Sequence, residues 1–263
     1  MTIAVGLLAT DGIVLAADAQ ECIPGYAKRK QHKIMPGSTS GACIAVTGAG
    51  NSTYIDHATS EIIREGLNLA PVTASEYQAN LQATLRDIYE KHVIPFASYP
   101  DDYRPDFSLL IAAGNKFGTM LFVSDKNLLT NVHSFEAVGC GAFMAKTLLS
   151  TLYKPFPTLE IAECLAVYVI LQVKRFIDGC GDDTGVVTVT GRQTRWEGDK
   201  RVKEIEDLCA KFVDIQNNAF HHVIGYQDFI TGEQIQEEDI RLNLSRLKDC
   251  FRPLISQTSE GPQ

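Results

Sequence analysis

The beginning of the chain constrains its fold most strongly, because two apolar runs there flank a dipeptide that favours a tight turn. Residues 3–8 and 13–18 are almost entirely apolar, and Asp11-Gly12 lies between them. Asp-Gly pairs are preferred in two-residue hairpin turns, since glycine adopts positive φ at little cost. The sequence therefore predicts an antiparallel hairpin in which residue 18 returns beside the start of the chain.

Thr2 directly follows the initiator methionine, which gives it a chemical option that an internal threonine lacks. If Met1 is removed, Thr2 carries a free α-amine beside its hydroxyl. A threonine hydroxyl is a weak nucleophile until a base accepts its proton, and a terminal amine with a pKa of about 8 can be that base near neutral pH. Thr2 is thus a candidate nucleophile. The alternative is an ordinary residue that precedes the first strand.

Asp18 and Lys33 are candidates to assist the Thr2 hydroxyl. The predicted hairpin brings Asp18 near Thr2, and Lys33 begins another extended segment as the nearest cation able to pair with Asp18. A buried Asp-Lys pair beside Thr2 would favour the deprotonated hydroxyl. The alternative is a surface ion pair of little consequence.

These features resemble the beginning of proteasome β subunits and of the related bacterial peptidase HslV, which are N-terminal-nucleophile hydrolases. The resemblance rests on Thr2, the Asp-Gly turn, the strand Ile-Val-Leu-Ala-Ala-Asp at 13–18 and Lys33-Ile34. It continues through a third strand at 41–48 and weakens toward residue 191. It implies a bacterial or archaeal proteasome homologue.

The same resemblance implies roles for individual residues. Thr2 would be the nucleophile, supported by Asp18 and Lys33. The segment Gly48-Ala49-Gly50 is similar to the turn before the family's first helix, so the backbone N–H of Gly50 would form the oxyanion hole, with Gly48 as the second candidate.

Two later segments extend the resemblance with departures from the family pattern. Cys140 stands between Gly139 and Gly141, where a serine usually helps to position the terminal amine; a thiol is the weaker hydrogen-bonding group. Asp178 takes the place of the family's supporting aspartate if the alignment is anchored on the preceding helix. If the alignment is anchored on Thr184 instead, a hydroxyl stands where the family has its serine, but no aspartate stands at the expected place. The third interpretation is an acidic loop that caps the helix end. Gln20, where β subunits have an arginine, is closer to HslV.

The hydrophobic pattern predicts an α+β protein. Strands are expected at 3–10, 12–19, 41–48, 107–113, 119–123, 131–138 and 186–190, and helices at 52–69, 74–94, 141–153, 158–177, 199–216 and 234–250. This order suggests two packed antiparallel sheets with helices outside, and the resemblance implies the four-layer αββα sandwich. We expect a hydrolase domain at 1–195 and a C-terminal helical extension with a polar tail at 196–263. The extension packs on its own subunit or docks to a ring or cap.

Composition excludes several classes of protein. A net charge of −8 without a basic stripe argues against nucleic-acid binding, and the sequence has no membrane-length apolar run, so we expect a cytoplasmic protein. The seven cysteines form no Cys-x-x-Cys pair and the histidines lack metal-binding spacing, which predicts free thiols and neither cofactor nor metal. The adjacent His221-His222 is expected to be structural. A cysteine protease that uses Cys43 or Cys140 stays open, although the sequence indicates no histidine partner.

The function expected from these observations is a threonine endopeptidase that cleaves peptides or unfolded proteins through an acyl-enzyme on Thr2. By resemblance it would work inside a closed homo-oligomeric double ring that encloses the threonines, and the enclosure implies an ATP-dependent unfoldase as partner. The chain itself has no phosphate-binding loop. Two alternatives remain. One is an N-terminal-nucleophile amidohydrolase or peptide ligase acting on small substrates, and the other is a catalytically silent structural ring subunit.

Overall fold

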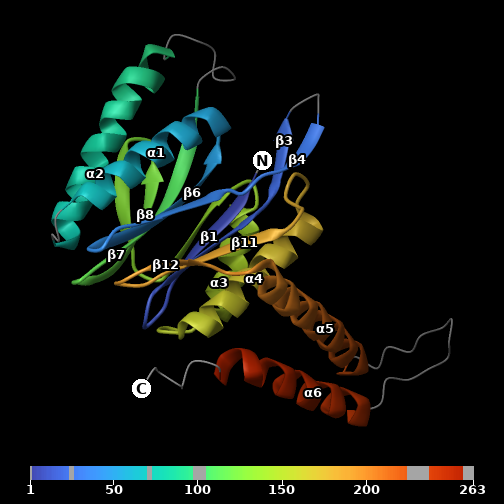
Figure 1. Cartoon of the computed structure of the whole chain (residues 1–263). Coiled ribbons are helices and arrows are strands. Elements are labelled where there is room, and N and C mark those ends of the chain that lie inside the picture. The colour runs from blue at the N-terminus through green and yellow to red at the C-terminus, as the bar shows by residue number, and fades with distance from the viewer. Residues whose placement is uncertain (1, 24–26, 70–72, 97–104, 224–236, 257–263) are drawn as a thin grey trace. The chain divides into compact units, whose positions relative to one another are not determined.

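Two five-stranded antiparallel sheets and a short hairpin make up the β structure of the described residues, which are 2–23, 27–69, 73–96, 105–223 and 237–256 of the computed structural model (Figure 1). The first sheet has the order β10 (Phe135–Gly139), β1 (Ile3–Leu8), β2 (Ile13–Asp18), β11 (Thr184–Val189), β12 (Thr194–Trp196). The second has the order β5 (Ile34–Ser38), β6 (Ala42–Gly50), β7 (Phe107–Asn115), β8 (Gly118–Asp125), β9 (Leu128–Val132). The hairpin pairs β3 (Gln20–Ile23) with β4 (Ala27–Lys30).

The hairpin predicted at the start of the chain is confirmed. Strands β1 and β2 pair antiparallel with Ala4 opposite Ala17 and Leu8 opposite Ile13, and the Ala9 N–H donates to the Gly12 carbonyl at 2.8 Å. Thr10 and Asp11 are therefore the two residues at the tip, and Gly12 does not adopt the positive φ that the Asp-Gly pair predicted. This register places Asp18 at the same end of the sheet as Thr2.

Alternation along β6 and β7 divides the core into two clusters. Ala45 and Leu110 belong to a buried cluster that joins residues of both sheets, whereas Val46 and Ile111 belong to a second cluster that includes buried helix residues. Because successive side chains of a strand point to opposite faces, a sheet buried on both faces is apolar almost throughout. The second sheet therefore contacts the first sheet on one face and helices on the other.

Helices lie against both sheets. The second cluster joins α1 (Ser52–Asn68) and α2 (Ala74–Ile88) to the second sheet, and α3 (Ala142–Leu152) and α4 (Leu159–Phe176) contact the first (Figure 1). A capping box between Thr73 and Glu76 starts α2, and the Tyr77 hydroxyl then donates to the Gly66 carbonyl of α1 at 3.0 Å. These contacts fix α1, whose first turn borders the site described below.

Several elements differ from those that the sequence predicts. The strand expected at 131–138 is two strands, β9 and β10, which belong to different sheets and meet at a bend. The helix expected at 74–94 ends at Ile88 and continues as a π turn and a short 3-10 turn, where Pro95 removes a backbone donor. The hairpin β3–β4 and strand β12 were not predicted, because short strands of polar residues give little periodic signal.

The C-terminal helices are α5 (Asp199–Val223) and α6 (Glu237–Ser256), and both exceed the lengths expected from the sequence. The chain divides into compact units at Met1–Val202 and Lys203–Gln263, so the expected boundary between 195 and 196 stays a prediction. Within the first unit, Arg201 at the start of α5 donates to the buried Glu163 carboxylate at 2.8 Å. Every helix in the described ranges is too short or too polar to span a lipid bilayer.

The end of β10 passes unusually close to the start of the chain. Gly139 has φ of 105°, and a Cβ added there would lie 2.0 Å from the Thr2 carbonyl oxygen. Only glycine fits, both because positive φ is unfavourable for other residues and because the space is taken. The backbone position of Thr2 therefore depends on Gly139.

Gly139→Ala tests this dependence, and Gly118→Ala is the matched control. Gly118 has φ of 127°, but a Cβ there would meet no atom within 4 Å. Positive φ should lower the free energy of unfolding of both variants by about 1 kcal/mol, and overpacking against Thr2 should lower that of the Gly139 variant by roughly 1–3 kcal/mol more. Urea unfolding of the two proteins measures the difference. Equal losses of stability would contradict the close approach of Gly139 to Thr2.

Candidate active site

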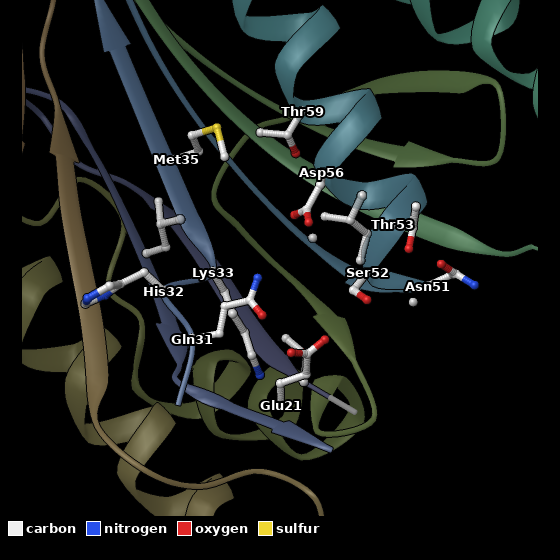
Figure 2. A pocket seen from close by; sticks show the side chains of 15 residues that line it. Glu21, Gln31, His32, Lys33, Met35, Asn51, Ser52, Thr53, Asp56 and Thr59 are labelled. Atoms are coloured by element: carbon white, nitrogen blue, oxygen red, sulfur yellow. The ribbon is translucent and has the colours of Figure 1, made fainter. Parts of the chain in front are cut away.

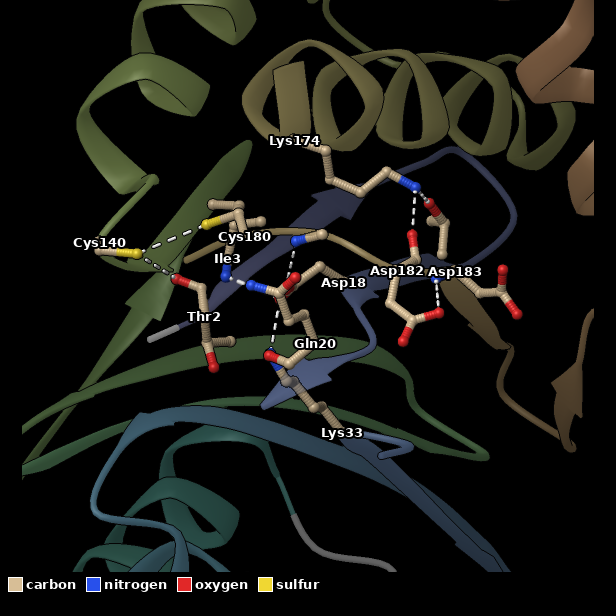
Figure 3. Close-up of polar contacts among 12 residues, drawn as sticks. Thr2, Ile3, Asp18, Gln20, Lys33, Cys140, Lys174, Cys180, Asp182 and Asp183 are labelled. Carbon is tan, nitrogen blue, oxygen red and sulfur yellow. Dashed lines mark hydrogen bonds and ion pairs between the residues drawn. The ribbon is translucent and has the colours of Figure 1, made fainter. Parts of the chain in front are cut away.

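Thr2 is buried, with only 8% of its surface exposed, and its backbone is held by contacts from the turn after β10. Gly139 packs against the Thr2 carbonyl, and the Cys140 thiol donates to the same oxygen at a distance of 3.4 Å (Figure 3). The structure thus places Cys140 beside Thr2, where the sequence analysis expected a positioning residue.

Asp18 is the centre of the polar contacts around Thr2. Its side chain is fully buried at the end of β2, and its Oδ1 accepts hydrogen bonds from the Ile3 N–H at 3.0 Å and from Lys33 Nζ at 2.8 Å (Figure 3). Its Oδ2 accepts from the Gly181 N–H at 3.0 Å. Charge-assisted bonds of this kind offset the cost of burying the carboxylate. Asp18 consequently links the residue after Thr2 to two other segments of the chain.

Lys33 is partly buried beside the buried Asp18. Its side chain is 10% exposed, and its ammonium also donates to the Gln20 carbonyl at 2.5 Å. The pair therefore does not lie at the surface, and its assistance to Thr2 stays a prediction. A cation held in a site with little water acts more strongly on a neighbouring group than one at the surface.

Thr2 and Lys33 line a single cavity of about 450 Å³. One wall is formed by residues 31–35, which lead into and begin β5, and the opposite wall by the first turns of α1 (Figure 2). The lining is polar on the helix side, where it consists of Asn51, Ser52, Thr53, Asp56 and Thr59, with Ile55 among them. The volume lies in the range of small-molecule and side-chain pockets.

The glycines expected to bind an oxyanion line the same cavity. Gly48 and Gly50 lie opposite Leu109 and Phe107 of β7. The Leu109 N–H donates to the Ser124 hydroxyl, at 2.8 Å, and the Phe107 carbonyl accepts from the Tyr89 hydroxyl, at 3.3 Å. The backbone groups of Leu109 and Phe107 are thus engaged away from β6, so Gly48 and Leu109, and likewise Gly50 and Phe107, do not exchange backbone hydrogen bonds.

In an antiparallel pair, the backbone groups of such residues point away from the partner strand. The N–H groups of Gly48 and Gly50 therefore face away from β7, on the side of β6 where β5 runs. The pairing of β5 with β6 ends at Ile34 and Thr47, so both glycines lie beyond it. The start of α1 follows immediately, and a helix N-terminus adds positive potential at this place. The arrangement suits an anion that forms beside Thr2.

The loop between α4 and β11 supplies contacts that the sequence analysis missed. Lys174 of α4 donates to the Asp182 carbonyl and to the Thr184 hydroxyl, both at 2.9 Å, and thereby fixes the loop. Within it, Gly181 binds Asp18, and the Cys180 Sγ lies 3.4 Å from the Cys140 Sγ. Gly181 and Thr184 lie in the segment that resembles the family's serine-containing stretch, but the contacts of this loop arise only where distant segments meet and carry no sequence signal of their own.

Asp178 lies in the same loop but is exposed. Its neighbours Cys180 and Gly181 contact the cluster around Thr2, and Thr184 is engaged by Lys174. The role expected for Asp178 stays a prediction.

A cysteine nucleophile at Cys43 is not supported. Cys43 is fully buried in the core, and burial raises the pKa of its thiol to about 11, so it is protonated at neutral pH. In the described part of the chain, no three His, Cys, Asp or Glu side chains are grouped as a metal site would require. His221 is partly buried in α5, while the side chain of His222 lies outside the described residues.

Sequence comparisons give no relative for this chain. No protein-family model matches it, and no curated protein matches it. Solved structures, in contrast, match over most of its length.

Three of these structures are Anbu proteins. A Gly-1 mutant of Anbu from Hyphomicrobium sp. strain MC1 is 16% identical, with a TM-score of 0.68, covering 84% of this chain and 96% of its own. Anbu (ancestral β-subunit) from Yersinia bercovieri is 15% identical, with a TM-score of 0.64 and coverage of 80% and 94%. Anbu from Pseudomonas aeruginosa, solved as a helical assembly, is 17% identical, with a TM-score of 0.64 and coverage of 82% and 95%.

Likeness at this level of identity shows the fold and nothing finer. It confirms the coarser α+β fold that the resemblance implied, and it does not favour HslV in particular. The chain therefore has the α+β fold of the Anbu proteins, with antiparallel sheets and packed helices.

Proposed function

We propose that this protein is a threonine-type hydrolase that cleaves peptide bonds through an acyl-enzyme on Thr2. The observation that carries the proposal is the buried Asp18–Lys33 ion pair beside Thr2, with Thr2 and Lys33 lining one cavity. A structural role alone would not require a lysine ammonium to be kept at the wall of a cavity that Thr2 also lines.

The proposed first step uses Thr2 as both nucleophile and base. After removal of Met1, the neutral α-amine accepts the hydroxyl proton, directly or through water, while Oγ attacks the carbonyl carbon. The Lys33 ammonium favours the negative oxygen electrostatically, and Asp18 holds that ammonium in place. Because the amine must be neutral to act, the rate should rise with pH through an amine pKa of about 8.

The tetrahedral intermediate then needs donors for its oxyanion. The N–H groups of Gly48 and Gly50 are the candidates, since both glycines line the cavity and face away from β7. Preorganised donors of this kind lower a barrier by about 3 kcal/mol each. Collapse breaks the C–N bond as the leaving nitrogen takes the proton from the amine, and water subsequently hydrolyses the ester.

Cys140 and Asp178 keep the supporting roles proposed from the resemblance. Cys140 donates to the Thr2 carbonyl and so orients the residue that bears the amine. Asp178 is the weaker proposal because its side chain is exposed. Gly181 provides the direct contact from this loop to Asp18.

The finer architecture follows the same proposal. We infer the four-layer αββα sandwich of N-terminal-nucleophile hydrolases, with a hydrolase domain at 1–195 and an appended helical region at 196–263. Its substrates would be peptides or unfolded proteins in the cytoplasm. A small-amide hydrolase or peptide ligase would share the same core chemistry. Comparing the turnover of peptides with the turnover of small amides separates these functions. A silent structural subunit is the remaining alternative.

Activity toward a fluorogenic peptide tests the proposal. Thr2→Ala should lower kcat/KM by roughly 1,000-fold or more without unfolding the protein, because the nucleophile is lost. Lys33→Ala should lower it by about 100-fold, because the hydroxyl loses its cationic neighbour. Thr10→Ala is the matched control, since Thr10 is an early threonine outside the cavity lining and should leave the rate unchanged.

Two outcomes would contradict the mechanism. Retained turnover in Thr2→Ala would remove the proposed nucleophile. A Lys33→Ala protein with normal turnover and only a lower melting temperature would reassign the ion pair to structure. If the wild-type protein cleaved only small amides, the proposed peptidase function would be replaced by the amidohydrolase alternative.

A homo-oligomer is the second part of the proposal. The Anbu protein from Pseudomonas aeruginosa was solved as a helical assembly, which supports self-association of this fold. We propose a closed ring that encloses the Thr2 sites, supplied by an ATP-dependent unfoldase. Light scattering during gel filtration should give a mass of several chains, because enclosed sites require neighbouring subunits. A stable monomer at micromolar concentration would contradict the ring.

A further inference from the structure

Two cysteines from distant parts of the chain meet beside Thr2. Cys140 follows β10 and Cys180 lies between α4 and β11, yet their Sγ atoms are 3.4 Å apart (Figure 3). The sulfur atoms of a disulfide are about 2.05 Å apart, so a shift of roughly 1.4 Å would join these two. The pair is close enough to bond without refolding either segment.

The two thiols differ in access to solvent. Cys140 is exposed, whereas Cys180 is buried with 6% of its surface accessible. Burial and the neighbouring Cys140 thiol raise the pKa of Cys180, which keeps it protonated. A small oxidant therefore meets Cys140 first, and Cys180 is placed to react with the product. An exposed thiol next to a resolving cysteine is the arrangement expected of a redox-sensitive site.

We propose that Cys140 and Cys180 are a modification site at which a peroxide converts the two thiols into an intrachain disulfide. Cys140 sulfur attacks one peroxide oxygen, so that an S–O bond forms, the O–O bond breaks and one water leaves after proton transfer. Cys180 sulfur then attacks the sulfenic sulfur while the Cys180 thiol proton passes to the sulfenic oxygen, so that the S–S bond forms, the S–O bond breaks and a second water leaves. In total two thiols and one hydrogen peroxide give one disulfide and two waters.

The disulfide would act on the candidate active site from two sides. It removes the S–H donor of Cys140 from the Thr2 carbonyl, which that thiol contacts at 3.4 Å. It also pulls Cys180 toward Cys140, and with it the loop whose Gly181 N–H donates to Asp18. Oxidation should therefore displace Thr2 relative to its supporting pair and lower turnover by about ten-fold or more. This effect on turnover rests on the proposed function, whereas formation of the disulfide does not.

Mass spectrometry of the full-length protein tests the modification directly. The reduced protein is treated with hydrogen peroxide, the remaining thiols are blocked with N-ethylmaleimide, and the peptides are mapped without reduction. We expect one cross-linked pair that joins Cys140 to Cys180, a loss of two hydrogen atoms from the chain and reversal by dithiothreitol. Cys164→Ser is the control that retains the cross-link, and Cys140→Ser and Cys180→Ser each abolish it. Cys180→Ala replaces Cys180→Ser if the serine variant does not fold.

Other products would overturn the proposal. One is Cys140 that carries two or three added oxygens without a cross-link, and another is a disulfide between chains. A third is Cys140 and Cys180 that both stay reduced after peroxide treatment, so that the peptide map of the Cys140 variants equals that of the wild type. A fluorogenic-peptide assay before and after oxidation then reports on turnover alone. A cross-link that forms in a protein without peptidase activity would refute the proposed function and leave the modification site intact.

Discussion

The buried carboxylate of Asp18 is the interaction on which the candidate site depends. It accepts from the Ile3 N–H, from Lys33 Nζ and from the Gly181 N–H, and its side chain has no exposed surface. A carboxylate in that position would be costly if any donor were missing, because an unpaired charge inside a protein loses its hydration without replacement. The fold therefore specifies three segments at once: the start of β1, the approach to β5 and the loop before β11.

This arrangement explains why the chemistry gathers at one end of the sheets. The β1–β2 hairpin returns Asp18 to the beginning of the chain, and the pairing of β5 with β6 begins immediately after Lys33. Gly139 lets β10 close over the Thr2 carbonyl. These contacts within the fold preorganise the groups that a reaction at Thr2 would use, so that little reorganisation is needed during the reaction.

Local sequence signals predicted the hairpin, most helices and the pairing of Asp18 with Lys33, because each follows from turn chemistry or short-range periodicity. The bend at His133-Ser134 that divides β9 from β10 was missed, since apolar residues lie close on both sides of it and the separation arises only from the packing of two sheets. Cys180 and Gly181 were missed for a related reason: they reach Cys140 and Asp18 through a loop whose path is set by Lys174. Asp178 was chosen by alignment to a helix end, and that criterion does not fix which way the side chain points. Whether Thr2 carries a free amine depends on processing, which no packing rule determines.

The central claim is that Thr2 combines a nucleophile and a base in one residue beside the Asp18–Lys33 pair. The most direct measurement is the intact mass of the untagged protein before and after incubation with a peptide epoxyketone, which reacts with both the hydroxyl and the amine of a terminal threonine. The account predicts a chain that has lost Met1 and gains one inhibitor molecule, with the adduct mapped to Thr2. A chain that retains Met1, or a free Thr2 that never reacts, would contradict it.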